Sequence, residues 1–472
     1  MSKNLILLAD SYKYTHHEQY PFDENGGYVT SYIEPRGPKD EVVMFFGLQA
    51  FIKEYLLTPI TKEDVNEAEQ VINAHLGPNM FNRAGWDYIV NELEGSLPLM
   101  IEAVDEGTVM PTGNMQVRVK NTDPKCFWLT SFMETALLRA VWYPSTVATK
   151  SFKLKKVWTQ YMEKTSDNLE SIPFKLHDFG ARGVSSEQSA EIGGMAHLVN
   201  FMGTDTVSGL VAARKYYGAD MAGFSVPASE HSTMTSWGRD GEHDAFDNML
   251  NKFGKEGAIV SIVIDSYNQY DASLWLFEQY ERAKTGGYKI VLRPDSGTPE
   301  VVVKELLKNA ESVLGDAITI NSKGYKVLPA EFGILWGDGI NVQSSQTILS
   351  TMAQLGWAAD NILFGMGGEL LQSVNRDTYS YAMKTCFIEF ANKDGKVVDT
   401  RDVFKDPIDD KGKTSKRGNL CTVMLSNGEV KTLPIEQLQG NEIHLMNPVY
   451  WNGREMSVTT FEEVRTKSSS YI

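Results

Sequence analysis

The chain has 472 residues, of which 42% are hydrophobic and 22% charged, a composition that excludes a disordered, collagen-like or disulfide-built protein. At about 150 residues per domain, it could form about three domains or one large barrel with additions. Its 61 acidic residues outnumber its 45 basic ones, and the net charge of −16 argues against binding nucleic acid or anionic membranes through a basic surface.

The three cysteines, Cys126, Cys386 and Cys421, lie far apart and include no Cys-x-x-Cys pair. This excludes a cysteine-based zinc site and fits a reducing compartment. The first apolar run, at residues 5–9, is too short for a signal peptide, and no run approaches the ~18 residues of a membrane-spanning helix. We therefore expect a soluble, cytoplasmic protein.

The first 150 residues mix helical and strand patterns without a regular strand–helix repeat. Their hydrophobic periodicity predicts a helix over 82–93, strands over 97–104 and 115–120, and an apolar helical stretch over 126–142. This part of the chain is therefore expected to be a mixture of helices and strands.

The middle of the chain repeats one pattern, in which a short apolar run ends in a polar or glycine-rich turn and a helical pattern follows. Seven such runs occur, at 173–180, 197–205, 223–231, 258–266, 288–297, 332–339 and 361–368. Residues 258–264 are almost continuously apolar, as expected of a parallel strand buried on both faces. The pattern predicts an irregular (β/α) barrel over residues 151–379.

The clearest helix of this region spans 299–314. Thr298 can cap its start, Pro299 suits the first helical position, and Gly315 follows its end. After about residue 380 the strand–helix repeat stops, and residues 392–395 and 426–428 have the composition of hairpin turns. We predict an α/β fold in which 1–150 and 380–472 together form a second, discontinuous α+β domain.

Active sites of (β/α) barrels lie at the carboxyl ends of the strands. In this chain those ends carry Asp178, Asp205, Glu230, His231, Asp265, Arg293, Asp295, Asp338 and the glycine-rich turn 365–368. A single polar strand end is uninformative, but carboxylates at most of the ends favour a shared functional rim.

Two glycine-rich turns, 337–339 and 365–368, each follow a strand and precede a helix. Glycine lets an anion approach the backbone closely, and the free N–H groups of a helix start attract it. Each turn alone could simply be tight, but the two together, after the last two strands, favour a phosphate site.

Arg293 and Asp295 lie side by side after one strand, and Asp265 ends another. Arginine suits phosphate, and aspartate suits a sugar diol or Mg²⁺. The alternatives are a local ion pair between Arg293 and Asp295, and a helix cap for Asp265. The sequence lacks His-Glu-x-x-His, a Walker A loop and Gly-x-Ser-x-Gly, which disfavours zinc hydrolases, P-loop ATPases and α/β-hydrolases.

Several longer blocks resemble a known family. They are LADSYKYTHHEQYP, KLHDFGARGVSS, HLVNFMGTDTVSG, SVPASEHST, IVLRPDSG, GDG, FGMGGELLQ and the pair Arg376-Asp377. Their order and spread, from about residue 4 to 418, are similar to the nicotinamide phosphoribosyltransferase family, type II phosphoribosyltransferases related to the nicotinate-specific enzymes.

The resemblance implies transfer of phosphoribose from phosphoribosyl pyrophosphate (PRPP) to nicotinamide, which gives nicotinamide mononucleotide and pyrophosphate in NAD salvage. It also implies Mg²⁺, stimulation by ATP, and a homodimer with active sites at the subunit interface. No nucleic acid or membrane partner is expected.

The resemblance further implies roles for individual residues. Phe179 and the partner subunit's Tyr12 would sandwich the pyridine ring, with Arg293 nearby, and Asp205 would accept a hydrogen bond from the carboxamide. The ribose and 5′-phosphate would contact Arg293, Asp295, Gly337, Asp338, Gly367 and Gly368. The pyrophosphate would face Arg182, Arg376, Lys384 and the partner subunit's Arg36. Asp265 and Asp295 would bear on Mg²⁺, and His231 would be phosphorylated by ATP.

These residue types suit the chemistry. The bond from C1 to pyrophosphate breaks through an oxocarbenium-like state, so the leaving group needs cations and carboxylates tolerate the charge on the ring. A carboxylate at position 205 would accept from an amide and repel nicotinate.

Other interpretations stay open. Phe179 and Tyr12 could be core or interface aromatics, His231 a structural histidine, and Asp10 a helix cap. A basic run, Lys411, Lys413, Lys416 and Arg417, is typical of a solvated loop but could also cover phosphates. The sequence departs from the family pattern at Ala181, Glu369 and Ala382, which affects pocket details. The alternatives to the proposed activity are a nicotinate phosphoribosyltransferase of the same fold and a catalytically silent barrel that binds a ligand or signals.

Overall fold

The computed structural model describes residues 4–409 and 413–472, which form two compact units. We call them the terminal unit and the barrel unit. The terminal unit comprises Met1–Thr146, Lys215–Gly218 and Asn375–Tyr471, and the barrel unit comprises Val147–Arg214, Ala219–Val374 and Ile472.

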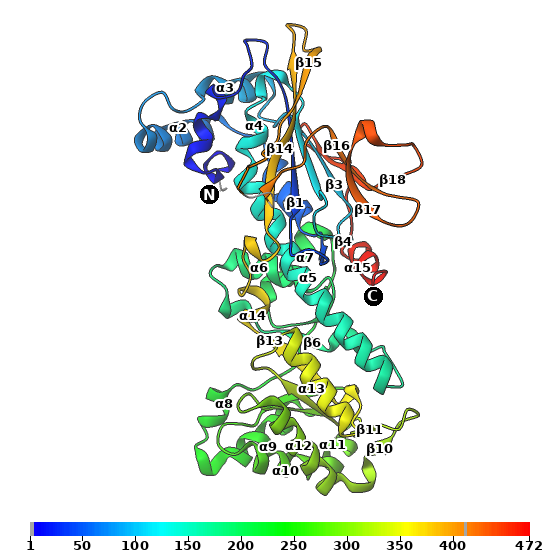
Figure 1. Cartoon of the computed structure of the whole chain (residues 1–472). Coiled ribbons are helices and arrows are strands. Elements are labelled where there is room, and N and C mark those ends of the chain that lie inside the picture. The colour runs from blue at the N-terminus through cyan, green and yellow to red at the C-terminus, as the bar shows by residue number, and fades with distance from the viewer. Residues whose placement is uncertain (1–3, 410–412) are drawn as a thin grey trace. The chain divides into compact units, whose positions relative to one another are not determined.

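The terminal unit contains a seven-stranded sheet built from both ends of the chain. In sheet order its strands are β15 (Val397–Asp402), β14 (Tyr381–Ala391), β1 (Gly27–Pro35), β5 (Val117–Asn121), β3 (Leu99–Val104), β19 (Met446–Trp451) and β20 (Arg454–Glu455). Strand β1 lies between β5 and β14 and is antiparallel to both (Figure 1). This pairing confirms the predicted second fold component made from the N- and C-terminal segments.

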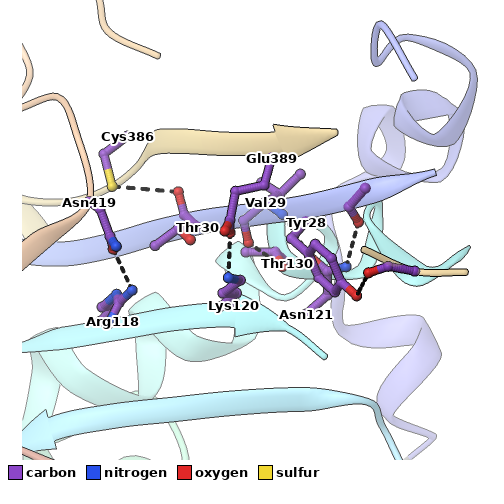
Figure 2. A network of polar contacts seen from close by, with 12 residues as sticks. Tyr28, Val29, Thr30, Arg118, Lys120, Asn121, Thr130, Cys386, Glu389 and Asn419 are labelled. Atoms are coloured by element: carbon purple, nitrogen blue, oxygen red, sulfur yellow. Dashed lines mark hydrogen bonds and ion pairs between the residues drawn. The ribbon is translucent and has the colours of Figure 1, made fainter. Parts of the chain in front are cut away.

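Polar side chains join these distant segments (Figure 2). The buried Asn121 side chain accepts from the Val29 N–H at 2.7 Å and donates to the Gly27 carbonyl at 2.9 Å. Lys120 forms an ion pair with Glu389 of β14, as Figure 2 shows. The Asn121 bonds thus tie β5 to β1, and the Lys120–Glu389 pair ties β5 to β14 on the other side of β1.

Helices and two smaller sheets complete the terminal unit. The helices include α1 (Leu48–Phe51), α2 (Lys62–Leu76), α3 (Arg83–Glu92), α4 (Leu129–Phe132) and α15 (Phe461–Ser469), and α5 begins in this unit and runs over Glu134–Thr165. The smaller sheets are β2 (Val42–Met44) with β4 (Val109–Pro111), and β17 (Val430–Pro434), β16 (Leu420–Met424) and β18 (Ile443–His444).

The predicted elements of this unit are largely confirmed. Helix α3 and strands β3 and β5 lie where the sequence places them, and both predicted turns connect antiparallel pairs, β14 with β15 and β16 with β17. The single helical stretch expected over 126–142 is wrong in its bounds. It is divided into α4 and α5, and α5 continues to Thr165 with Pro144 inside it.

The barrel unit is built on a parallel sheet. Its order is β7 (Gly203–Thr204), β6 (Leu176–Asp178), β13 (Ile362–Met366), β12 (Phe332–Trp336), β9 (Lys289–Arg293) and β8 (Ile259–Val263). Every neighbouring pair is parallel. The predicted irregular (β/α) barrel is therefore confirmed as a fold class.

One of the seven expected strands does not form. The segment 223–231 makes only single parallel bridges, Phe224 to Gly203 of β7 and Ala228 to Ser261 of β8. Pro227 has no N–H to donate, although its carbonyl accepts from the Ser261 N–H at 2.9 Å. The segment thus links the two edge strands of the sheet without a regular ladder.

The barrel helices follow the strands. They are α6 (Glu187–His197), α7 (Val207–Tyr217), α8 (His231–Thr235), α9 (Glu242–Phe253), α10 (Gln269–Phe277), α11 (Tyr280–Gly286), α12 (Pro299–Leu314), α13 (Val342–Gln354) and α14 (Gly368–Leu371), with a short hairpin of β10 (Thr319–Ile320) and β11 (Lys326–Val327). Helix α12 has the predicted bounds, but Thr298 makes no side-chain capping bond. Among the described helices, none is both long and apolar enough to cross a membrane.

Candidate active site at the carboxyl ends of the barrel strands

Phe179, which follows β6, forms an aromatic surface at this end of the barrel. A Cβ atom added at Gly365 would lie 2.2 Å from Cε2 of the Phe179 ring, so only glycine leaves room for the ring there. The Arg293 guanidinium lies 6.0 Å from the ring centroid. The Gly180 N–H donates to Asp178 Oδ1 at 2.7 Å, which fixes the turn that carries Phe179.

Asp205, which follows β7, presents a partly exposed carboxylate, and His177 contacts both this carboxylate and the Phe179 ring. Its Oδ1 atom accepts from His177 Nε2 at 2.9 Å and from Ser225 Oγ at 2.5 Å, and 45% of the side chain is exposed. Burial raises the pKa of Asp205, but the bonds from His177 and Ser225 and the charge of Arg293 outweigh it, so the net pKa shift is downward. The group is therefore ionised at neutral pH.

A second group of carboxylates gathers at β8, β9 and β12. His231 Nε2 lies 3.0 Å from Asp265 Oδ1, and the Asp265 side chain is only 7% exposed. Burial raises the pKa of Asp295, and the charges of Asp265 and Asp338 add to this, against the opposing effect of Arg293. Asp265 does not cap the following helix, because Asn268 caps α10 instead.

Asp265 and Asp295 are the carboxylates of this group that could hold a magnesium ion. Within 4–409 and 413–472 no cluster of three or more His, Cys, Asp or Glu side chains is arranged to hold a metal. Mg²⁺ commonly binds through one or two carboxylates together with substrate phosphates, and Asp265 and Asp295 supply such a pair. A nearby cation would favour the ionised form of Asp295, whose pKa is raised by burial and by the charges of Asp265 and Asp338.

Arg293 is available to a ligand. Its side chain makes no hydrogen bond or ion pair with any described residue, and its Nε atom is buried without a partner. The alternative of a local ion pair with Asp295 is therefore not realised. A guanidinium without a partner in the protein suits an anionic group such as phosphate.

The two glycine-rich turns both precede helices, as predicted. The turn 337–339 leads into α13, whose first turn is capped by Asn341 accepting from the Ser344 N–H at 3.0 Å. The second turn enters α14 at Gly368, and a Cβ atom at Gly183 would lie 3.1 Å from Gly368 Cα. The loop that carries the exposed Arg182 therefore packs against the second turn.

Helix α14 is anchored by a lysine. Lys150 Nζ donates to the Glu369 carbonyl at 2.5 Å and to Glu369 Oε1 at 2.7 Å. The residue that departs from the family pattern at position 369 thus has its own counter-ion, which neutralises its charge beside the turn.

The predicted cations of the terminal unit form a cluster. Burial lowers the pKa of Lys384, and the positive charges of Arg36, Lys13 and Arg376 add to this, while Glu134 opposes it. Lys13 pairs with Glu134, and Arg36 Nε is buried without a partner. These residues lie near one another and carry more positive than negative charge, as an anion site requires.

Tyr12 lies at this cluster, with Lys13 Nζ 5.2 Å from its ring centroid. The side chain is 57% exposed. It is therefore not a core aromatic within this chain, and its ring is accessible to a ligand or a second subunit.

Other sequence candidates have local structural contacts. Asp10 makes no side-chain cap and instead accepts from Thr135 Oγ1 at 2.7 Å. Glu230 takes part in a capping box at the start of α8. In the basic run, Lys416 pairs with the buried Glu34, so it is not simply solvated, and Lys411 lies outside the described residues.

Comparison with known proteins places the chain in a family. A family model described as the nicotinate phosphoribosyltransferase (NAPRTase) family matches residues 174–440, and one described as the nicotinamide phosphoribosyltransferase N-terminal domain matches residues 4–101. The chain belongs to the nicotinate phosphoribosyltransferase family.

Two relatives of this family member are both described as nicotinamide phosphoribosyltransferases. The chain is 45% identical to the nicotinamide phosphoribosyltransferase of Xanthomonas campestris pv. campestris (strain 8004), over 99% of this chain and 98% of that protein. It is 31% identical to the nicotinamide phosphoribosyltransferase of Acinetobacter baylyi (strain ATCC 33305 / BD413 / ADP1), over 98% and 97% of the respective chains.

Solved structures agree in fold. A nicotinate-nucleotide pyrophosphorylase from Pyrococcus furiosus matches with a TM-score of 0.63 and 14% identity over 100% of this chain and 96% of that one. Human nicotinic acid phosphoribosyltransferase matches with a TM-score of 0.56 and 14% identity over 98% and 93% of the chains. At this identity the likeness supports the fold alone.

Sequence reasoning missed three residues at the sites of this phosphoribosyltransferase. His177 and Ser225 contact Asp205, and Lys13 belongs to the cation cluster of the terminal unit. His177 had a detectable signal, because residues 177 and 179 of an extended chain share one face. Ser225 lies in the SVPASEHST block, but nothing in that block indicates its contact with Asp205, which depends on the irregular segment 223–231.

Proposed function

We propose that this chain transfers phosphoribose from PRPP to nicotinamide, giving nicotinamide mononucleotide and pyrophosphate, a step of NAD salvage. The similarity over nearly its whole length to proteins described as nicotinamide phosphoribosyltransferases supports the activity. The observation that carries the choice of base is the ionised, partly exposed Asp205 carboxylate, whose partner His177 also packs against Phe179.

The base would bind by stacking and one hydrogen bond. Phe179 offers a flat face for the pyridine ring, and Asp205 accepts from the carboxamide NH₂. Nicotinate has a carboxylate in place of the amide, so it would bring two negative charges together. The pyridine nitrogen is already a nucleophile, so no general base is needed.

The reaction would exchange one bond at the ribose C1 atom for another. The C1–O bond to pyrophosphate breaks with its electron pair leaving on the pyrophosphate, and the pyridine nitrogen donates a pair to C1. Arg293 and the turns 337–339 and 365–368 would hold the ribose and its 5′-phosphate, and Asp265 and Asp295 would hold Mg²⁺, which stabilises the charge on the leaving group.

The remaining cations would bind the pyrophosphate. By the family resemblance, Arg182, Arg376 and Lys384 would face it. In a homodimer with interfacial sites, the partner subunit's Arg36 and the partner subunit's Tyr12 would complete the site. The exposure of Tyr12 supports this assignment.

ATP would stimulate the reaction by phosphorylating His231. The imidazole is 47% exposed, and Asp265 accepts from its Nε2 atom, which orients the ring. The described cysteines are all free and buried, which supports a reducing, cytoplasmic location.

One assay tests the proposal. Purified protein is incubated with PRPP and Mg²⁺ and either nicotinamide or nicotinate, with and without ATP, and mononucleotide is quantified. We expect nicotinamide mononucleotide and a higher rate with ATP. No product from either base would refute the enzyme and favour the silent barrel, and equal rates with and without ATP would remove the role of His231.

The Asp205→Asn variant tests the choice of base. An amide at this position no longer offers a charged acceptor and no longer repels nicotinate. We expect kcat/KM for nicotinamide to fall about 10- to 100-fold, since a hydrogen bond to a charged group is lost. Unchanged nicotinamide turnover would favour a nicotinate-preferring enzyme instead.

A further inference from the structure

We infer that His177 is a positioning residue for base selection: it holds the Asp205 carboxylate in the orientation that accepts nicotinamide and rejects nicotinate. The inference rests on the proposed function, which assigns Asp205 to the carboxamide. It adds a residue that contacts neither the reacting atoms nor, in this scheme, the base.

The two oxygens of the Asp205 carboxylate differ in their hydrogen-bond partners. His177 Nε2 and Ser225 Oγ both bond to Oδ1, at 2.9 and 2.5 Å. No described residue donates a hydrogen bond to Asp205 Oδ2. One oxygen is therefore used to fix the carboxylate, and the other stays open to accept from an amide.

The second observation is how firmly His177 itself is held. Only 11% of its side chain is exposed, and its ring centroid lies 4.8 Å from that of Phe179. His177 pairs in register with Gly203 of β7, and a Cβ atom at Gly203 would lie 2.9 Å from His177 Nδ1. The absent side chain at Gly203 thus makes room for the imidazole against the strand that leads to Asp205.

The hydrogen bond to Asp205 determines which nitrogen of the His177 ring carries the proton. An ionised carboxylate only accepts hydrogen bonds, so Nε2 carries the proton that faces Asp205 Oδ1. The same imidazole packs against Phe179, which would stack on the pyridine. His177 thereby connects the two surfaces that would contact the base and sets their relative placement.

The consequence concerns selectivity rather than turnover alone. Without the donor at position 177, the Asp205 side chain can rotate, and it can take up a proton more easily. A protonated or rotated Asp205 accepts a weaker hydrogen bond from the carboxamide of nicotinamide, and it repels the carboxylate of nicotinate less. Removal of His177 should therefore lower kcat/KM for nicotinamide more than it lowers kcat/KM for nicotinate.

Two substitutions of His177 separate positioning from packing. His177→Leu keeps an apolar side chain against Phe179 and removes the donor. His177→Gln places an amide nitrogen near the position of Nε2 and keeps the donor. We expect the Leu variant to lower kcat/KM for nicotinamide about 10- to 100-fold and to narrow the nicotinamide-to-nicotinate ratio, because a charge-assisted bond is lost.

The Gln variant should recover most of that ratio, and KM for PRPP should change little in either variant. The inference would be overturned if kcat/KM fell equally for both bases. It would also be overturned if the Leu variant kept the wild-type nicotinamide-to-nicotinate ratio. A Gln variant no better than Leu would overturn it as well. Thermal unfolding checks the fold of each variant, and if the Leu variant does not fold, His177→Asn, whose amide is too short to reach Asp205, replaces it with the same expected outcomes.

Failure of the proposed function would look different. In that case the wild-type protein itself would form no nicotinamide mononucleotide. The positioning role is refuted when the wild-type protein is active and selective and the variants give any of the three contrary outcomes named above.

Discussion

Lys175 is a buried lysine that immediately precedes β6, at the opposite end of that strand from Phe179. Its Nζ atom donates to the Asp360 carbonyl at 2.8 Å and the Ile362 carbonyl at 3.1 Å. Burial lowers the pKa of Lys175 to about 7, and the charge of Lys289 adds to this against that of Asp360. Two carbonyl acceptors match the two N–H bonds of a neutral amine.

This lysine should make the stability of the protein depend on pH. Above pH 7 the folded chain has lost a proton that the unfolded chain, with an ordinary lysine pKa of about 10.4, still holds. The free energy of unfolding should therefore rise with pH, by on the order of 2 kcal/mol between pH 7 and pH 9 from this residue.

Urea denaturation at both pH values measures the effect, with Lys175→Met as the variant. Methionine has a similar length and does not titrate, so its stability should change less between the two pH values. A variant with the same pH dependence as the wild-type protein would show that Lys175 is protonated in the fold. Lys308→Ala, which breaks an exposed pair with Glu305 on α12, serves as a control.

At the scale of elements, α14 shows how a short helix is held in place for a phosphate. With only four residues it has little stability of its own. It is fixed by Gly183 on one side and by Lys150 of α5, whose ammonium group bonds to the Glu369 carbonyl and carboxylate. The position of the second glycine-rich turn therefore depends on a residue of another helix.

We expect Lys150→Ala to raise KM for PRPP about 3- to 10-fold with a smaller change in kcat, because the turn is less ordered and Glu369 is left as an unpaired negative charge beside it. Glu369→Gln removes that charge, so the double variant should bind PRPP better than Lys150→Ala alone. Steady-state kinetics of the four proteins measures this coupling. Strict additivity of the two changes would show that the pair does not act on the turn.

How far the sequence predicts these elements depends on whether their signals are local. The bounds of α12 follow from Pro299 and Gly315, which lie next to the helix they delimit. The segment 223–231 has the apolar character of a strand, yet Pro227 prevents a regular ladder. The division between α4 and α5 has no comparable local marker, so the sequence merges them.

The residues of the candidate site also differ in whether a local sequence signal locates them. Residues at strand ends, such as Asp205 and Asp295, can be located from the barrel pattern because parallel strands end at one face. The contact of Ser225 with Asp205 depends on tertiary packing, and the pairing of β1 with β14 joins residues more than 340 positions apart. Neither pairing has a signal within a short stretch of sequence.

At the scale of the whole molecule, the question is whether one active site draws on two chains. Tyr12 and Phe179 belong to the terminal and barrel units, respectively, and the proposal assigns the partner subunit's Tyr12 to the ring held by Phe179. If so, two different defects should complement each other within one dimer, because a C2 arrangement forms two equivalent sites.

Two chains with different affinity tags, one carrying Tyr12→Ala and the other Phe179→Ala, are co-expressed and the mixed dimer is isolated through both tags. One of its sites then has both aromatic rings and the other has neither, so activity should be about half that of the wild-type dimer. Each variant alone should be strongly impaired, because both of its sites lack one ring. If Tyr12 served the Phe179 of its own chain, every site of the mixed dimer would lack one ring, and activity would stay at the level of the single variants.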